Sequence, residues 1–467
     1  MSTITNVRFA DIAIGASAAL TRTLARHDLD LFALLSGDAN PSHLDPVYAA
    51  AGPFHHLVAP AVWGGALISA LLGSELPGAG TVLLRQQFDF TGPIALGDSV
   101  TARVTVRAKD ADGDRVTLDC DIVNQHGDTV LRGWAEVAAP ADQSTTERVA
   151  LPELILRAPQ RRYGQLIART HGMAPLRTAV VHPVDVNALA GAVEAVKAGL
   201  IAAVLIGPRA QIAAAALAAG LDLGACEIVD AGDGEAAARI GAAMAGAGQV
   251  DALMKGSLHT DVLMRAVLAP EARLRTARRM SHVFAIDAPA YPRPLFITDA
   301  ALNLYPTLAD KRDIAQNAIE LAHALGIAHP RVALLSAVET VNPDIRSTLD
   351  AAALCKMADR GQITGAVLDG PLAFDNAVSF EAAATKGIVS PVAGMADILL
   401  VPDVEAGNML AKQLEYLGGA QMAGIVLGAR VPIILTSRAD KTMARLASCA
   451  IALLLARHGA RAAEEAP

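Results

Sequence analysis

Aromatic residues are scarce in this chain of 467 residues, since Phe, Trp and Tyr together make up only 3%. Apolar residues nevertheless reach 53%, so the cores must be built from Ala, Val, Leu and Ile. The length predicts two or three domains. Charged residues make up only 18% and the net charge is -8, which argues against broad binding to the phosphates of a nucleic acid.

Cysteine is rare as well, and its four copies (Cys120, Cys226, Cys355 and Cys449) lie far apart without a CxxC pair. This predicts reduced thiols of a cytoplasmic protein rather than a disulfide framework or a zinc site. No apolar stretch reads as a membrane span of about 20 residues, and no signal-peptide pattern is present at the start. The only closely spaced histidines, His55 and His56, have no further ligands at metal spacing, so we predict no metal site.

The most informative stretch is FALLSGDANPSHLDPVYA, residues 32–49. Its two prolines restrict the backbone, so the polar groups of Asp38, Asn40 and His43 should be held in a rigid loop. A carboxylate and an imidazole five residues apart can share one water, as acid–base addition of water to a double bond requires. The plainer interpretation is an Asx-type turn in which Asp38 and Asn40 bond only to backbone.

This run resembles the signature of the MaoC-like, or (R)-specific, enoyl-CoA hydratases of the hot-dog fold. The resemblance implies that Asp38 and His43 are the catalytic pair, with Asn40 near the substrate. It also implies an acyl-CoA site at a dimer interface. Where the family has a His-Gly pair at the start of its central helix, this chain has Pro60 and Ala61, so the Ala61 N–H would face the thioester carbonyl. A thioesterase, or a dehydratase of another acyl thioester, is the alternative enzyme.

The rest of the first domain, 1–139, fits an α+β hot-dog fold. The run 61–72 is apolar nearly all round, which predicts a helix buried on every side. Polar and apolar residues alternate with period two over 99–107, 116–123 and 129–137, which predicts antiparallel strands. The Ala, Pro, Ser and Thr residues that follow predict a linker at 140–150, before a second domain at 151–467.

In the second domain, apolar strands alternate with helices, which predicts an α/β fold with a parallel, doubly wound sheet. Polar residues follow several strands: Lys255 and Ser257, then Ser336, Asp369 and the pair Ser437-Arg438. Because ligands bind at the carboxyl ends of such strands, we expect these groups to meet at one edge of the sheet. Strand-to-helix corners and turns are the plainer interpretation.

Further polar stretches belong with these strand ends, and they supply Arg278, Arg279, Ser281, His282, Asp299, Asn303, Asn408 and Lys412. Guanidinium groups suit phosphate because they place two N–H donors on two oxygens. The alternatives are a solvated basic face for the arginines and a helix N-cap for Asp299. Taken in order, these stretches resemble the phosphate acetyl/butyryltransferase family over nearly all of 151–459.

The resemblance implies transfer of an acyl group between CoA and phosphate, with Ser437 and Arg438 as catalytic residues and the other polar residues binding substrate. An Asp that the acetyltransferase branch has seven residues after the Ser is Ala444 here, which suggests the butyryltransferase branch, with Asp440 as the candidate substitute. The whole chain resembles bifunctional enoyl-CoA hydratase/phosphate acyltransferase proteins. We expect no cofactor. The expected ligands are acyl-CoA, phosphate and acyl phosphate, and the expected assembly is a homo-oligomer. The alternative is that the hot-dog domain is inactive and serves as a CoA-binding or assembly module.

Overall fold

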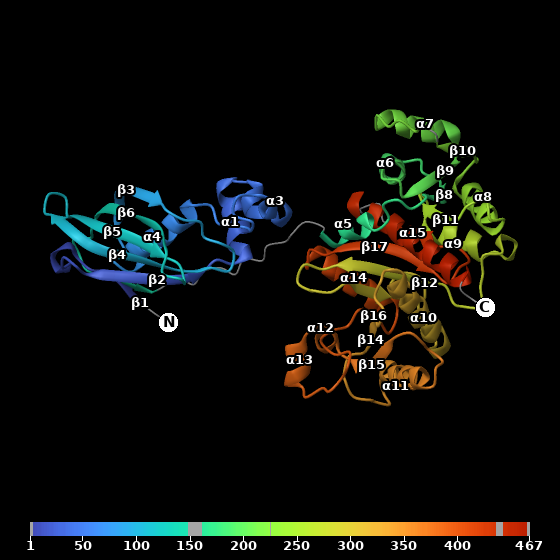
Figure 1. The fold of residues 1–467 in the computed structure, drawn as a ribbon. Helices are drawn as coiled ribbons and strands as arrows, with labels where there is room; N and C mark the ends of the chain where they lie inside the picture. Colours follow the sequence, from blue (N-terminus) through green and yellow to red (C-terminus); the bar gives the residue numbers. More distant parts are fainter. Residues whose placement is uncertain (1–2, 148–160, 225, 436–441, 465–467) are drawn as a thin grey trace. The chain divides into compact units, whose positions relative to one another are not determined.

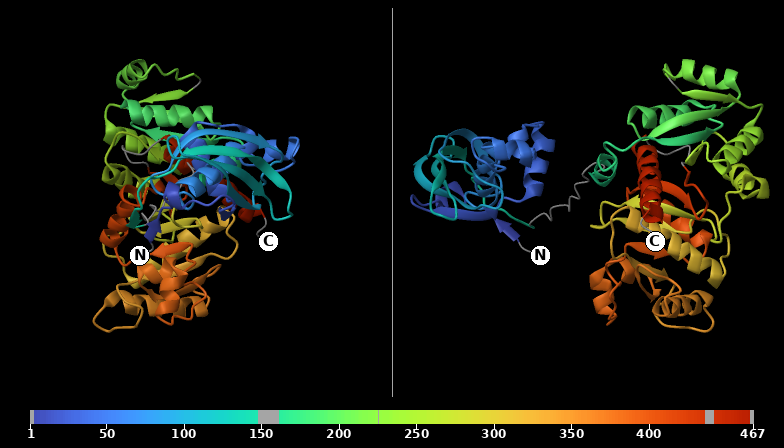
Figure 2. Two further views of the ribbon diagram at one scale, coloured as in Figure 1. Left: turned by 90° about the vertical axis from the view of Figure 1, so that its left-hand side faces the viewer. Right: turned by 45° about the vertical axis from the view of Figure 1, so that its right-hand side comes forward.

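The structure, a computed structural model, describes residues 3–147, 161–224, 226–435 and 442–464 (Figures 1 and 2). The chain divides into two compact units, Met1–Arg157 and Ala158–Pro467. No helix among the described residues has both the length and the apolar character that a membrane crossing needs.

The first unit is a five-stranded antiparallel sheet in the order β2-β4-β5-β6-β3, packed around helix α4. This arrangement is the expected hot-dog fold, and the period-two runs form the central strands. The strands are β1 (Thr3–Thr5), β2 (Ser17–Thr23), β3 (Val82–Phe90), β4 (Ser99–Asp110), β5 (Arg115–Val123), β6 (Thr129–Ala138) and β7 (Thr145–Glu147). The helices are η1 (Phe9–Asp11), α1 (Arg26–Ser36), α2 (Pro41–Leu44), α3 (Pro46–Ala51) and α4 (Val62–Ser74).

Helix α4 is less buried than predicted. Trp63, Leu67, Ile68 and Leu71 face the sheet and are buried, but a stripe of small residues on the opposite side is exposed. The stripe consists of Ala66, Ser69, Ala70 and Gly73. Because Ala and Gly fit either a core or a surface, the sequence pattern did not distinguish this face from the buried one.

Part of the predicted linker, 140–150, belongs to the first unit. Strand β7 lies within this stretch and pairs antiparallel with β1 at the start of the chain, with Thr3 opposite Glu147. The side chain of Asn6 also bonds to this stretch, since its amide donates to the Asp142 carbonyl and its Oδ1 accepts from the Ser144 N–H. The described part of the stretch, up to residue 147, therefore packs with the hot-dog unit.

The second unit is built on an 11-stranded sheet in the order β10-β9-β8-β11-β18-β17-β12-β13-β16-β14-β15. Its strands are β8 (Leu176–Val181), β9 (Ile201–Gly207), β10 (Glu227–Asp230), β11 (Ala252–Lys255), β12 (Ser281–Asp287), β13 (Leu295–Thr298), β14 (Arg331–Leu335), β15 (Val367–Leu372), β16 (Ile398–Leu400), β17 (Gln421–Leu427) and β18 (Ile433–Ile434). Its helices are α5 (Arg161–Ala168), α6 (Val186–Lys197), α7 (Arg209–Ala218), α8 (Gly234–Gly246), α9 (Thr260–Leu268), η2 (Pro270–Ala272), α10 (Leu308–Ala324), α11 (Arg346–Asp359), α12 (Phe374–Val378), α13 (Phe380–Thr385), α14 (Val404–Tyr416) and α15 (Thr442–Glu464).

Helices cover both faces of this sheet, as expected for a doubly wound α/β fold (Figure 1). Residues of β8 alternate between two cores: Leu176 and Val180 belong to a core shared with α6, α7, α10, α11 and α15, whereas Ala179 and Val181 face α8 and α9. On the sheet face covered by α8 and α9, a separate core under α12, α13 and α14 covers the half of the sheet that contains β13 and β16.

The sheet is mixed at its centre rather than parallel throughout. Strand β12 runs antiparallel to both β17 and β13, and β17 runs antiparallel to β18. The parallel block β10-β9-β8-β11-β18 therefore runs opposite to the parallel block β13-β16-β14-β15. The prediction that all polar strand ends share one edge is wrong, because the carboxyl ends of β11 and of β14 point to opposite edges.

Candidate active sites

In the first unit, the loop after α1 brings Asp38 and His43 into one geometry. His43 Nδ1 lies 2.8 Å from the Val58 carbonyl oxygen. A carbonyl oxygen only accepts, so Nδ1 carries a proton, and in this tautomer Nε2 presents a lone pair. Nε2 lies 3.9 Å from Asp38 Oδ2. That distance is too long for a direct hydrogen bond but allows one water to bond to both atoms.

The same loop also forms the predicted Asx turn, so the two interpretations coexist. Asp38 Oδ1 accepts from the Asn40 N–H at 3.1 Å, while Oδ2 stays on the side of His43. Asn40 Oδ1 accepts from the Ser42 N–H at 3.0 Å and caps α2. The side-chain carbonyl of Asn40, a residue predicted to bind substrate, therefore already accepts a hydrogen bond within the loop.

His43 and Ala61 line one cavity of about 430 Å³. Ala61 stands at the N-cap of α4, and among the described residues no hydrogen bond uses its N–H, as expected in a first helical turn. The rest of the cavity wall is mainly apolar and is formed by Phe54, Val58, Ala59, Gly64, Phe90, Thr91, Gly92, Pro93, Ile94, Val130 and Leu131. An imidazole acceptor and a helix N-terminus thus border one largely apolar space.

In the second unit, a polar network beyond the end of β13 joins four predicted site residues, of which three are buried and Arg279 is exposed. Asn303 Nδ2 donates to Asp299 Oδ2 at 2.5 Å and to the Met280 carbonyl at 2.9 Å. Asn303 Oδ1 accepts from Arg279 Nε at 2.7 Å. Ser281, at the start of β12, accepts from Asn317 Nδ2 at 2.9 Å. Asp299 also accepts from the N–H groups of residues 301 and 302, so it holds the turn after β13 in the way an N-cap does.

His282 lies at the boundary between the two cores on the α8 and α14 face. On β17, Met422 belongs to one core and Val426 to the other, with Gly424 between them. A Cβ at Gly424 would lie 2.5 Å from the Leu435 carbonyl oxygen and 2.9 Å from His282 Nε2. Burial lowers the pKa of His282 to about 4, and the neighbouring Asp299 carboxylate opposes this shift. The imidazole is therefore neutral at physiological pH.

Several predicted residues lie apart from this network, and their side chains have local partners. Ser336 Oγ lies 2.8 Å from Ser347 Oγ, and Asp369 Oδ1 accepts from the following N–H at 2.9 Å. Lys412 bonds to Glu415 in the same helix at 2.9 Å. Asn408, in contrast, approaches the network, because its amide donates to the Ala300 carbonyl at 3.1 Å.

Lys255 and Ser257 lie at the carboxyl end of β11. Lys255 Nζ is 3.3 Å and 3.4 Å from the carbonyl oxygens of Gly256 and Leu258. Ser257 donates a short hydrogen bond to Asp185, the N-cap of α6. Sequence reasoning missed the residues beside this strand end, Asp185 and His182; the only signal was the polar HPVD run that follows an apolar strand.

Ser437, Arg438 and Asp440 lie outside the described residues. Ala444, where the acetyltransferase branch has Asp, is buried in the core beneath α15. An ionised carboxylate there would be costly without a partner, which fits the apolar residue found.

A cavity of about 610 Å³ adjoins the network and carries a basic wall of Arg275, Arg278 and Arg279. Two of these arginines have acidic neighbours: Arg278 forms an ion pair with Glu320 at 2.5 Å, and Arg279 lies 3.7 Å from Asp310. Such a wall suits a ligand with several phosphoryl oxygens.

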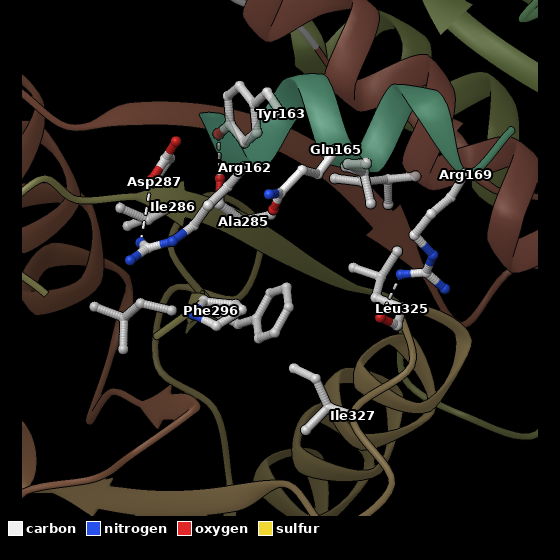
Figure 3. Close-up of a pocket in the computed structure, with 14 residues that line it drawn as sticks. Arg162, Tyr163, Gln165, Arg169, Ala285, Ile286, Asp287, Phe296, Leu325 and Ile327 are labelled. Atoms are coloured by element: carbon white, nitrogen blue, oxygen red, sulfur yellow. Dashed lines mark hydrogen bonds and ion pairs between the residues drawn. The ribbon is translucent and has the colours of Figure 1, made fainter. Parts of the chain in front are cut away.

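Another cavity, shown in Figure 3, lies beside α5 and contains none of the predicted site residues. Arg162 and Arg169 border it, but Arg162 pairs with Asp287 at 3.1 Å and Arg169 donates to the Leu325 carbonyl at 2.6 Å. Tyr163 donates to the Ala285 carbonyl at 2.7 Å. These contacts fasten α5 to β12 and to the end of α10.

Comparison with known proteins agrees with this division. The family described as phosphate acetyl/butaryl transferase matches residues 234–453, and the MaoC like domain matches residues 11–121. A phosphate acetyltransferase of Rhizobium meliloti is 58% identical over 295 residues, which span 63% of this chain and 93% of that protein. The chain belongs to the phosphate acetyl/butyryltransferase family. A MaoC-like domain is fused to this family's domain.

Solved structures resemble each part. The crystal structure of a branched-chain phosphotransacylase from Enterococcus faecalis is 32% identical, with a TM-score of 0.53, and the match covers 61% of this chain and 100% of that one. The R-hydratase PhaJ1 from Pseudomonas aeruginosa is 39% identical over 33% of this chain and 99% of that one, with a TM-score of 0.33. The high identity to a protein named an acetyltransferase does not support the expected butyryltransferase branch.

Metal ligands do not cluster in the part of the chain that the structure describes: it contains no group of three or more His, Cys, Asp or Glu side chains arranged to hold an ion. Independence of metal ions remains a prediction for both units.

Proposed function

We propose that the chain is a bifunctional acyl-CoA enzyme: an enoyl-CoA hydratase fused to a phosphate acyltransferase. The observation that carries the hydratase half is the cavity of about 430 Å³ that His43 and Ala61 both line, with Asp38 Oδ2 3.9 Å from His43 Nε2. Membership of the acyltransferase family carries the other half.

In the proposed hydration, one water donates its two hydrogens to Asp38 Oδ2 and His43 Nε2. Its oxygen attacks C3 of the 2-enoyl thioester as one of these groups takes the proton. The charge that develops on the thioester oxygen is met by the Ala61 N–H at the start of α4. The protonated group then delivers its proton to C2, which gives a 3-hydroxyacyl-CoA.

In the proposed transfer, a phosphate oxygen attacks the thioester carbonyl and the C–S bond breaks, which gives acyl phosphate and the CoA thiol. The protein has to hold both substrates in register and stabilise the tetrahedral oxyanion. We propose Ser437 and Arg438 as the catalytic residues. The proposed binding residues are those around the Asp299 network, Lys255 and Ser257 at β11, and the more distant Ser336, Asp369 and Lys412. No cofactor or metal is proposed.

The test is a pair of assays on the full chain. Loss of crotonyl-CoA absorbance reports hydration, and release of free thiol from acetyl-CoA or butyryl-CoA, with and without phosphate, reports transfer. Thiol release without phosphate would favour the thioesterase alternative. CoA-ester binding without hydration would favour an inactive, CoA-binding hot-dog domain.

We also propose that the hot-dog unit pairs with a second copy of itself. Strand β3 stands at the edge of its sheet, and Val82, Leu83, Leu84 and Phe90 on it are exposed. Long apolar edge strands favour pairing with another chain. Phe90 also lines the cavity with His43, so a partner on β3 would border the proposed site. We also propose the domain boundaries given above and a location in the cytoplasm.

A further inference from the structure

Helix α10 presents a row of polar side chains to the loop that leads into β12. The row consists of Asp310, Asp313, Asn317 and Glu320, which are three or four residues apart and therefore share one face of the helix. The loop carries the basic wall of the cavity of about 610 Å³. In the described lining of that cavity, neither Asp313 nor Asn317 appears, so any effect of these two residues on a ligand there must pass through the loop.

Two side chains of the row hold the main chain of Arg279 from both sides. Asp313 Oδ2 accepts from the Arg279 N–H at 2.9 Å. Asn317 Nδ2 donates to the Arg279 carbonyl oxygen at 2.9 Å and also to Ser281 Oγ at 2.9 Å. The pairing of β12 with β17 begins only at Ser281, so α10 supplies the hydrogen-bond partners that a neighbouring strand would otherwise give to Arg279.

The turn after β17 closes the other side of this arrangement. A Cβ at Gly428 would lie 2.6 Å from the Arg279 carbonyl oxygen and 3.0 Å from Asn317 Nδ2. Asn317 itself is buried. The main chain of Arg279 therefore has little room to shift between α10 and this turn.

The side chain of Arg279 is oriented as well, but it stays accessible. Its Nε donates to Asn303 Oδ1 at 2.7 Å, and the side chain is exposed. Because Nε is only one of the five N–H donors of a guanidinium group, Arg279 can still receive phosphoryl oxygens. The carboxylate in the described cavity lining, Asp261, forms an ion pair with Arg265 at 3.4 Å, so the wall keeps its positive charge.

The other contacts of α10 distinguish Arg279 from its neighbour Arg278. Glu320 pairs with the side chain of Arg278, not with its main chain, and both side chains are exposed, so this ion pair is weak. Asp313 has a second partner, because its Oδ1 accepts from Arg312 at 2.7 Å. Both oxygens of Asp313 are thus engaged within the protein, which fits a residue that acts through Arg279 rather than on a ligand.

We infer that Asp313 and Asn317 are positioning residues for anion binding: they fix Arg279 in the basic wall before a phosphoryl group arrives. A group that is already in place loses less freedom when a ligand binds, which strengthens binding. Arg279 is a proposed substrate-binding residue, so the inference rests on the proposed acyl transfer for its two candidate ligands, inorganic phosphate and CoA.

The test is calorimetric titration of the full chain with inorganic phosphate and, separately, with CoA. Asp313→Ala removes the acceptor for the Arg279 N–H, whereas Asp313→Asn keeps an oxygen there but loses the charge. Gln316→Ala is the matched control, because Gln316 on the same helix bonds to the carbonyl and N–H of Thr364, at 3.2 Å and 3.0 Å. Thermal unfolding without ligand checks folding, and Asn317→Ala, which removes the donor to the Arg279 carbonyl, is the second variant.

We expect Asp313→Ala and Asn317→Ala to raise the Kd of phosphate, of CoA or of both by roughly 10- to 100-fold, since misplacing a positioned group costs up to about 100-fold. Asp313→Asn should restore binding close to wild type, and Gln316→Ala should bind as wild type. The ligand whose binding weakens is the one whose phosphoryl oxygens Arg279 receives.

Unchanged binding of both ligands by either folded alanine variant of Asp313 or Asn317 overturns the inference, and so does a wild-type chain that binds neither ligand. Binding by Asp313→Asn as weak as by Asp313→Ala also overturns it, because the charge of Asp313 and not its bond to the main chain would then matter. Thiol release tests the proposed transfer separately. The expected binding pattern without phosphate-dependent release leaves the inference and refutes the transfer, whereas release without that pattern does the reverse.

Discussion

Replacing Asp38 by Asn should abolish hydration while preserving the loop. Asp38 uses one oxygen for the turn, accepting from the Asn40 N–H at 3.1 Å, and presents the other 3.9 Å from His43 Nε2. An Asn side chain keeps the turn acceptor but places an NH₂ group or a weaker acceptor toward the water. Loss of a positioned acid–base group costs about 10²- to 10⁴-fold in rate, or roughly 2.7–5.5 kcal/mol of activation free energy.

The assay is hydration of crotonyl-CoA, with phosphate-dependent thiol release measured on the same preparation. Asp45→Asn is the matched control, because Asp45 caps α3 through Oδ1 in the same loop, with the Val47 N–H at 2.8 Å, and Asn caps helices equally well. We expect Asp38→Asn to lose hydration, and the control to keep it, with thiol release unchanged in both. Full hydration by folded Asp38→Asn would refute the assignment of the pair.

The remaining predictions concern Ala61, Arg438 and His282. Ala61→Gly should raise the rate of crotonyl-CoA hydration and Ala61→Val should nearly remove it, since a displaced oxyanion donor costs about 2.7–4 kcal/mol; an unchanged rate in Ala61→Val would show that Ala61 is not at the carbonyl. Arg438→Gln should raise KM for phosphate far more than KM for acyl-CoA, since roughly 1.5–3 kcal/mol of charge-assisted bonding is at risk, and equal effects would count against a phosphate role. Because burial lowers the pKa of His282 to about 4, the unfolded chain binds the extra proton first, so the free energy of unfolding should fall as pH drops from about 6.5 toward 4. Urea unfolding should show that His282→Gln weakens this fall, and an identical pH dependence in the variant would contradict the neutral, buried imidazole.

The hot-dog unit was predictable because its strands alternate with period two, as β4 and β5 do over most of their length. The direction of β12 and β17 was not predictable, because a strand buried on both faces is a continuous apolar run in either direction. The setting of His182 was not predictable for another reason: it depends on a left-handed backbone and on glycines from three separate segments. Asp38 and His43 were recognisable because they lie five residues apart in one short run of the sequence, although the Val58 carbonyl that orients His43 lies outside that run.

The central claim is that one chain carries two independent sites for acyl-CoA, and product analysis on a single preparation tests it most directly. The full chain is incubated with crotonyl-CoA and with butyryl-CoA, each with and without phosphate, and the products are identified by ³¹P NMR and mass spectrometry. The account predicts that 3-hydroxybutyryl-CoA forms from crotonyl-CoA regardless of phosphate, and that acyl phosphate and equimolar free thiol form from butyryl-CoA only with phosphate. Absence of either product, or thiol release that does not depend on phosphate, would contradict it.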